Sequence, residues 1–262
     1  MDFGVSGKTA LITGASQGIG LAIAQSLARE GCNLLLVSRG REGLERAKEL
    51  IQGQAKVQVE ILAQDLSSTA AVSAVGEAAG HVDFLVNNAG SIPQGDLLTI
   101  DDERWRAAWD LKVFGFINLT REIYRAMRER RAGVILNIIG SSGERPSPNY
   151  IAGTSGNAAL MQFTRALGGE SVDHSIRVVG INPGQIETPR QTDRWEAKAE
   201  ALFGDKARWR ELEEIRNSPF GRLARPEEVA DVAAFLLSAR ASYVSGTIVT
   251  VDGGRMGRLK PF

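Results

Sequence analysis

Short, almost uninterrupted apolar runs alternate with stretches of helical periodicity along nearly the whole chain. The runs are dense in Val, Ile and Leu and show little alternation with polar residues. Strands buried on both faces have this composition, as in a parallel sheet that helices cover on both sides. The runs predict strands at residues 8–13, 33–38, 57–62, 83–86, 133–139, 176–181 and 247–251.

The stretches between these runs place apolar residues three and four positions apart, which is the spacing of an amphipathic helix. They predict helices at residues 18–30, 41–53, 101–129, 153–170 and 226–239. Repeated strand–helix–strand units require right-handed crossovers and therefore a doubly wound parallel sheet of the Rossmann type. We predict an α/β fold of about seven strands with helices on both faces.

No linker rich in Pro, Gly or Ser divides the chain, so a single domain over residues 1–262 is the simplest organisation. Residues 189–220 break the alternation with a charged and aromatic segment. Such a segment after a late strand is a common place for a substrate lid. A lid here would suit a substrate with an apolar body and an acid group, although a segment that only packs is the alternative. The residues that would close over the substrate are Arg190, Arg194, Trp195, Phe203 and Trp209.

Composition and charge narrow the class of protein. Hydrophobic residues make up 43% of the chain and charged residues 24%, which supports a large core. The 31 basic residues equal the 31 acidic ones, so charge favours neither a nucleic-acid nor a membrane partner. No apolar run approaches the roughly 18 residues of a membrane span, and the lone Cys32 suits a reducing compartment. We expect a cytoplasmic protein, and no metal, because His81 and His174 lack metal-ligand spacing.

The segment TGASQGIG at residues 13–20 lies directly between the first predicted strand and the first predicted helix. Gly14 permits the tight turn, and Gly18 and Gly20 let the backbone approach a pyrophosphate at the positive end of the helix. This context predicts a dinucleotide site. Its first members are Thr13, Gly14, Ser16, Gln17, Gly18, Ile19 and Gly20.

The end of the second strand selects the nucleotide. An acidic residue there would bind the ribose 2′-hydroxyl of NAD and repel a 2′-phosphate. This chain has Ser38 and Arg39 instead, and a guanidinium suits phosphate. We therefore predict NADP as the cofactor in preference to NAD.

Further motifs follow later strands in a fixed order. Asp65 and Leu66 follow the third strand, NNAG at residues 87–90 the fourth, and NPGQIET at residues 182–188 the sixth. Together with the glycine-rich turn, they resemble the short-chain dehydrogenase/reductase family over about residues 5–254. The resemblance implies NAD(P)-dependent chemistry on alcohols and carbonyls, and a homodimer or homotetramer.

By position, the resemblance assigns these motifs to successive parts of the dinucleotide. The adenine and adenosine side takes Asp65, Leu66, Asn88, Ala89 and Gly90. The nicotinamide end takes Pro183, Gly184, Ile186 and Thr188.

The chain departs from the pattern at the residues that carry the family's chemistry. The family uses a serine after the fifth strand, a tyrosine and a lysine in the next helix, and an asparagine in the preceding long helix. Aligning NIIG at residues 137–140 with the family's Asn-Ile-Ser-Ser places Gly140, Gly153, Asn157 and Lys112 at these positions. Unaltered family chemistry is not expected, because loss of a general acid alone costs roughly 10²–10⁴ in rate.

A rebuilt active site is our working interpretation. Tyr150 lies three residues before the family's tyrosine position, and the glycine at that position leaves room for its ring to lean across. Lys112 would supply the ammonium missing at Asn157 and depress the phenol pKa, and Ser142 or Ser141 would supply the hydroxyl. We predict an oxidoreductase that acts on a small-molecule carbonyl or alcohol with Tyr150, Lys112, Asn157 and Ser142 as catalytic residues.

Other interpretations stay open at this point. A non-redox reaction such as hydration, dehydration or C–C cleavage would use Glu144 as acid or base. A cofactor-binding sensor or an inactive partner subunit would need no turnover. A different alignment keeps Tyr150 as the family tyrosine and puts Thr154 at the lysine position.

Overall fold

The computed structural model describes residues 3–258, and its strands form one parallel sheet. They are β1 (Thr9–Thr13), β2 (Asn33–Ser38), β3 (Val59–Ala63), β4 (Phe84–Asn87), β5 (Gly133–Ile138), β6 (Ile176–Pro183) and β7 (Ile248–Val251). Their order across the sheet is β3-β2-β1-β4-β5-β6-β7. The predicted Rossmann-type sheet is confirmed, and no predicted strand end differs by more than two residues from the observed one.

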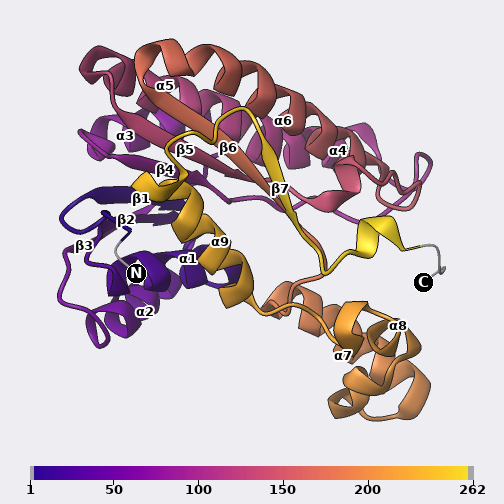
Figure 1. The fold of residues 1–262 in the computed structure, drawn as a ribbon. Helices are drawn as coiled ribbons and strands as arrows, with labels where there is room; N and C mark the ends of the chain where they lie inside the picture. The colour runs from indigo at the N-terminus through magenta and orange to yellow at the C-terminus, as the bar shows by residue number, and fades with distance from the viewer. Residues whose placement is uncertain (1–2, 259–262) are drawn as a thin grey trace.

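Helices cover both faces of the sheet (Figure 1). One face carries α1 (Gly18–Arg29), α2 (Arg41–Gln52) and α9 (Pro226–Leu237). The other carries α3 (Thr69–Ala79), α5 (Gly115–Arg130) and α6 (Ile151–Glu170). The strand order reverses between β1 and β4, and ligands of doubly wound sheets bind beyond the carboxyl ends of the strands at this point.

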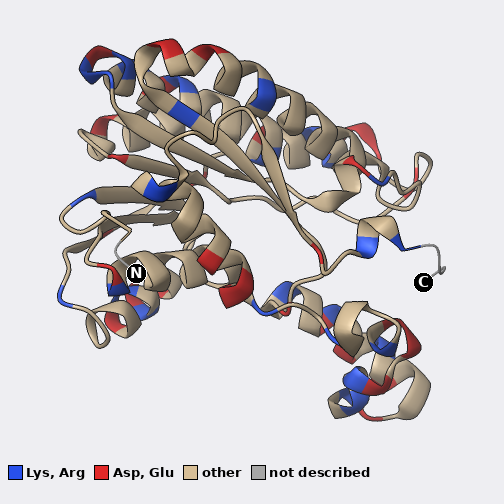
Figure 2. Ribbon diagram, viewed as in Figure 1, with Lys and Arg blue, Asp and Glu red and all other residues tan. Residues whose placement is uncertain are grey.

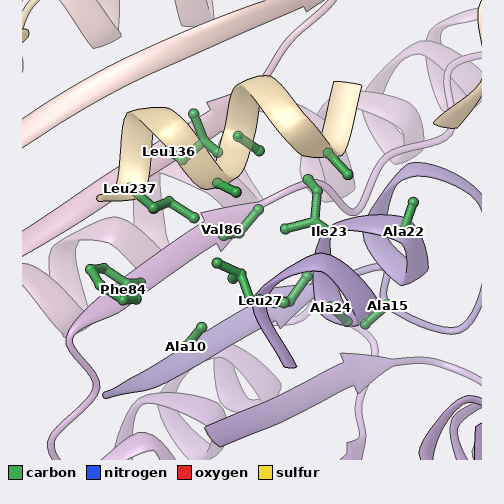
Figure 3. Packing of buried hydrophobic residues seen from close by; sticks show 14 of the residues in the cluster. Ala10, Ala15, Ala22, Ile23, Ala24, Leu27, Phe84, Val86, Leu136 and Leu237 are labelled. Carbon is green, nitrogen blue, oxygen red and sulfur yellow. The ribbon is translucent and has the colours of Figure 1, made fainter. Parts of the chain in front are cut away.

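The larger core lies between the sheet, α1 and α9 (Figure 3). Ile23 and Leu27 lie one helical turn apart on α1 and are fully buried. They meet strand residues such as Ala10 and Val86. Full burial of side chains of this size contributes about 1.5–3 kcal/mol each. This packing fixes the first turn of α1, and with it the glycine-rich segment before the helix.

The long helix predicted at residues 101–129 is interrupted. It begins as α4 (Asp102–Trp109), passes through a π-helical segment (Asp110–Phe114) and continues as α5. A π-helical turn inside an α-helix shifts the side chains that follow it and is frequent at functional sites. Here the segment turns Lys112 and Val113 into the protein, and both are buried.

Residues 189–220, the predicted lid, leave the sheet after β6 and return to it at α9 (Figure 1). They contain α7 (Pro189–Phe203) and α8 (Glu213–Arg216). The segment has a small core that includes Trp195, Trp209 and Ile215. Within residues 3–258, no helix has both the length and the apolar character needed to span a bilayer.

Candidate active site

A cleft of about 1230 Å³ opens along the ends of several strands. Its walls come from the residues that follow β1, β2, β4, β5 and β6, together with the start of α7. It therefore spans the point at which the strand order reverses, where the fold predicts a ligand. All the predicted cofactor residues line it except Thr13, Gly20 and Asp65.

Two of these exceptions lie directly behind the glycine-rich turn. The Thr13 hydroxyl accepts hydrogen bonds from the backbone amides of Asn88 and Ala89 at 2.8 and 3.0 Å, which ties the turn after β1 to the turn after β4. A Cβ atom on Gly20 would lie 2.4 Å from the Gly14 carbonyl oxygen. Both residues shape the cradle without reaching the cleft.

The third exception, Asp65, belongs to the turn after β3. Its carboxylate accepts from the backbone amide and the hydroxyl of Ser67 at 3.1 and 2.9 Å. It holds this turn, while Leu66 beside it lines the cleft.

The glycine-rich turn has room for a pyrophosphate. Gly14 and Gly18 have φ values of +63° and +59°, which favour glycine. A Cβ on Gly18 would lie 3.2 Å from Thr188 and intrude on the cleft that both residues line. The N-cap of α1, Gln17, makes no side-chain capping bond, so the first amides of the helix remain available to an anion.

At the end of the cleft beside β2, the residue after this strand presents an exposed guanidinium. Arg39 lines the cleft, and within the described part of the chain it forms no ion pair. Its neighbour Ser38 donates from its hydroxyl to the Gly40 carbonyl at 3.4 Å. A guanidinium so placed matches a 2′-phosphate.

Tyr150 is the N-cap of α6 and not part of the helix, which begins at Ile151. Its ring nevertheless lies over Gly153. A Cβ atom on Gly153 would fall 2.1 Å from both Cε1 and Cζ of the ring. The ring can occupy this position only because residue 153 has no side chain.

Lys112 reaches a different partner from the one its sequence position suggests. Its ammonium donates to the Ile138 carbonyl at 2.7 Å and lies 4.6 Å from the centroid of the Phe116 ring. The aliphatic part passes Gly90, where a Cβ would lie 2.4 Å from its Cδ. Burial, and then the charge of Arg190, lower the pKa of Lys112 from 10.5 to about 7.

The expectation that Lys112 depresses the pKa of Tyr150 is wrong. The pKa of Tyr150 is raised, mainly because the phenol is largely buried. The cation that opposes this rise is Arg190, through its charge and a hydrogen bond to the phenol. Arg190 also donates to the Ile92 carbonyl, so it joins α7 to the loop after β4. Sequence spacing cannot pair residues 40 positions apart, and the sequence places Arg190 only in the predicted lid.

Asn157, Ser142 and Gly140 form one unit. The Asn157 amide nitrogen donates to the Ser142 hydroxyl oxygen at 2.8 Å. A Cβ on Gly140, whose φ is +148°, would lie 2.8 Å from that nitrogen. Glycine at position 140 therefore makes room for the Asn157 side chain, and Asn157 in turn orients Ser142. Asn157 Oδ1 is buried without a hydrogen-bond partner among residues 3–258.

Glu144 is directed away from this chemistry. It does not line the cleft, and its carboxylate accepts from the Asn182 amide at 2.9 Å and from the Thr250 hydroxyl at 3.5 Å. This placement gives no support to a non-redox reaction that uses Glu144. In residues 3–258, no cluster of His, Cys, Asp and Glu could hold a metal ion.

The chain is similar to oxidoreductases over nearly its whole length. A family model described as enoyl-(acyl carrier protein) reductase matches residues 14–255. The 2,3-dihydro-2,3-dihydroxybenzoate dehydrogenase of Bacillus subtilis is 32% identical over 258 residues, covering 96% of this chain and 97% of that protein. Galactitol 2-dehydrogenase (L-tagatose-forming) of Cereibacter sphaeroides is 35% identical over 257 residues, with 96% of each chain covered.

A solved structure gives the same picture. The L-sorbose reductase of Gluconobacter frateurii, in complex with NADPH and L-sorbose, superposes with a TM-score of 0.93 and 36% identity. The match covers 99% of this chain and all of that one.

Substitution of Gly153 by Ala should expose the contact between residue 153 and Tyr150. An added methyl would overlap the phenol ring, and overpacking of this kind typically costs about 1–3 kcal/mol. Gly169, on the same helix, has no atom within 4 Å of its Cβ position, so Gly169→Ala should stabilise by about 0.5–1 kcal/mol. Denaturant unfolding of both variants measures the difference. Equal stabilisation by both substitutions would show that the ring does not lie over residue 153.

Replacement of Lys112 by Met should change how stability depends on pH. Between about pH 7 and 10.5 the unfolded chain binds a proton at Lys112 that the folded chain lacks. The free energy of unfolding of the wild type, measured relative to Lys112→Met, should therefore rise with pH in this window, by at most about 1.4 kcal/mol per unit. Denaturant titrations at pH 6, 7, 8 and 9 measure this slope.

The exposed Lys206 provides the control, because Lys206→Met should leave the slope unchanged. A free-energy difference between wild type and Lys112→Met that is constant with pH would contradict the lowered pKa.

Proposed function

The chain belongs to the short-chain dehydrogenase/reductase family, and on that premise we propose that it transfers a hydride between NADP(H) and a small-molecule carbonyl or alcohol. The observation that carries this proposal is the phenol of Tyr150, which lies over Gly153 in the cleft that the cofactor residues line. The phenol thus replaces, from a neighbouring position, the tyrosine that the family pattern places at 153. The homodimer or homotetramer and the cytoplasmic location stay predictions.

The cofactor would lie along the cleft from β2 to β6. The first amides of α1 would bind its pyrophosphate, and Arg39 its 2′-phosphate. Pro183, Gly184, Ile186 and Thr188 line the cleft at the end of β6 and would meet the nicotinamide. When bound, the reduced nicotinamide supplies the hydride. The NADPH complex of the similar L-sorbose reductase supports this choice of nucleotide.

Tyr150 would donate the proton that accompanies the hydride. Because burial raises its pKa, the phenol stays protonated at neutral pH, as a proton donor to a carbonyl oxygen must. The proton passes from Tyr150 Oη to the substrate oxygen, and the guanidinium of Arg190 stabilises the phenolate that remains.

Ser142 would orient the substrate oxygen. Its oxygen already accepts from Asn157, so its own hydrogen is free to point into the cleft that Ser142 lines. Lys112, with a pKa of about 7, is a group of the cleft lining whose charge changes around neutral pH.

Substitution of Tyr150 by Phe tests the proton donor. We expect kcat to fall by about 10²–10⁴-fold, because the general acid is lost, while the Kd for NADPH is unchanged. Tyr243→Phe is the matched control, since Tyr243 is fully exposed. The assay follows NADPH consumption with ketohexoses and cyclic ketones, and NADP⁺ reduction with hexitols and dihydrodiols, which the names of the relatives suggest. Turnover that survives Tyr150→Phe would remove the phenol from the mechanism.

The same assay separates the proposed function from its main alternative. NADPH binding without consumption across the whole panel would indicate a cofactor-binding protein without turnover. Failure to bind NADPH and NADH would reject both the oxidoreductase and the cofactor-binding protein without turnover.

Substitution of Arg39 by Ala tests the choice of nucleotide. Loss of a charged partner for the 2′-phosphate should raise the Kd for NADPH by about 10- to 100-fold and leave the Kd for NADH unchanged. Arg29→Ala removes the same charge from an exposed position in the last turn of α1 and should alter neither value. Titration of protein fluorescence with each nucleotide provides the constants. A parallel loss of both affinities would count against a 2′-phosphate contact.

A further inference from the structure

Basic side chains concentrate in the cleft although the chain as a whole is balanced. The sequence has 31 basic and 31 acidic residues. The carboxylate of Asp193 is the one acidic group in the described lining of the cleft. The basic groups of that lining are Arg39, Lys112, Arg145, Arg190, Arg194 and Arg255.

Three of these basic groups already have a place in the proposed reaction. Arg39 lies at the nucleotide end, Lys112 donates to the Ile138 carbonyl, and Arg190 contacts Tyr150. The other three, which we term the arginine cluster, are Arg145, Arg194 and Arg255.

The arginine cluster is assembled from three separate segments. Arg145 follows the short 3₁₀ turn after β5, Arg194 lies in the second turn of α7, and Arg255 begins the 3₁₀ turn after β7. Figure 2 shows basic segments at the start of α7 and in the turn after β7, where the chain leaves the sheet. Residues separated by 49 and 61 positions in the sequence thus line one end of the cleft.

The cluster brings like charges together, with Arg145 and Arg194 exposed and Arg255 half-buried. Arg145 donates to the backbone carbonyl of Arg255 at 3.4 Å. Burial, and then the charges of Arg145 and Arg194, lower the pKa of Arg255 against the opposing effect of Asp252. The Asp252 carboxylate also accepts from the amides of Gly254 and Met256, both at 2.8 Å, and so shapes the turn that holds Arg255. An anion bound here would relieve the mutual repulsion.

The 2′-phosphate and the pyrophosphate of the cofactor do not account for Arg255. Arg39 follows β2 and Arg255 follows β7, and five strand spacings separate these two strands in the sheet. At about 4.8 Å per spacing, the two ends of the cleft lie roughly 24 Å apart across the sheet. The pyrophosphate cradle follows β1 and is also distant from β7. Arg255 lies instead beyond the residues that follow β6, which the family resemblance assigns to the nicotinamide, and Arg145 donates to its backbone carbonyl.

We propose that the arginine cluster binds an anionic group of the substrate, a carboxylate or a phosphate, and restricts the reaction to carbonyl compounds and alcohols that carry one. The proposal rests on the proposed function, because it assigns the substrate end of the same cleft. Guanidinium groups bind both anions through paired, charge-assisted hydrogen bonds. Approach from three segments lets them surround one anionic group while the carbonyl lies toward Tyr150.

Matched pairs of probes test this assignment. Pyruvate is compared with methyl pyruvate, and dihydroxyacetone phosphate with dihydroxyacetone, by calorimetric titration of the NADPH-saturated protein. We expect the anionic member of one pair to bind about 10- to 100-fold more tightly than its neutral partner. A preference within the pyruvate pair would identify the anionic group as a carboxylate, and a preference within the dihydroxyacetone pair would identify it as a phosphate. The preference should shrink as salt rises from about 50 to 500 mM, because the cluster is partly exposed to solvent.

Arg194→Gln and Arg255→Gln should each remove most of this preference and leave the Kd for NADPH unchanged. The control is Arg208→Gln, since Arg208 pairs with Glu211 on the same segment and does not line the cleft. Equal binding within both pairs, or a preference that survives both substitutions, would overturn the proposal.

NADPH consumption, followed in parallel, separates this proposal from the proposed function. Turnover without a charge preference rejects the arginine cluster alone. A charge preference that depends on the cluster, without turnover on any probe or on the wider panel, rejects the reaction and retains the anion site.

Discussion

The contact between the Tyr150 ring and the backbone at Gly153 is the constraint on which the rest of the candidate active site depends. The ring fills the volume that any side chain at position 153 would need. Gly153 and Tyr150 therefore act together. The tyrosine precedes the helix, and its ring reaches the helix face because residue 153 has no side chain. Gly140 and Asn157 form a second pair of this kind. Because residue 140 has no Cβ atom, the Asn157 amide fits beside it and orients Ser142. In both cases a glycine at a family position gives its space to a neighbouring side chain.

Much of the fold could be predicted from the sequence because burial on both faces leaves a strong signal. Every strand was recognised from its Val, Ile and Leu content, and the glycine-rich turn from its place between strand and helix. Helix α3 was not among the predicted helices, because its sequence, TAAVSAVGEAA, is small and weakly amphipathic. The π-helical segment was also missed, since a one-residue shift of register inside a helix leaves no mark in apolar spacing.

The site was harder to predict than the fold, and the reason is geometric. Spacing indicated that Tyr150 could reach across Gly153, because both belong to one local segment. It could not indicate where the Lys112 ammonium would point, because the Ile138 carbonyl belongs to another element. Nor could it bring Arg190 to the phenol from the far side of β6. Long side chains find their partners through tertiary packing, and a single sequence records only the residues that make such contacts possible.

Arg190 then links Tyr150 and Lys112, two groups of the cleft lining whose pKa values it shifts. Its positive charge favours the deprotonated form of both, because it opposes the burial that raises the pKa of Tyr150 and adds to the burial that lowers the pKa of Lys112. The pKa values of the two groups therefore lie far apart. The Tyr150 phenol keeps its proton at neutral pH, and the Lys112 amine is half-protonated near pH 7. Because Arg190 lies in the first turn of α7, any movement of α7 that withdraws its guanidinium would raise both pKa values together. The position of residues 189–220 and the acid–base state of the cleft are therefore coupled through one side chain.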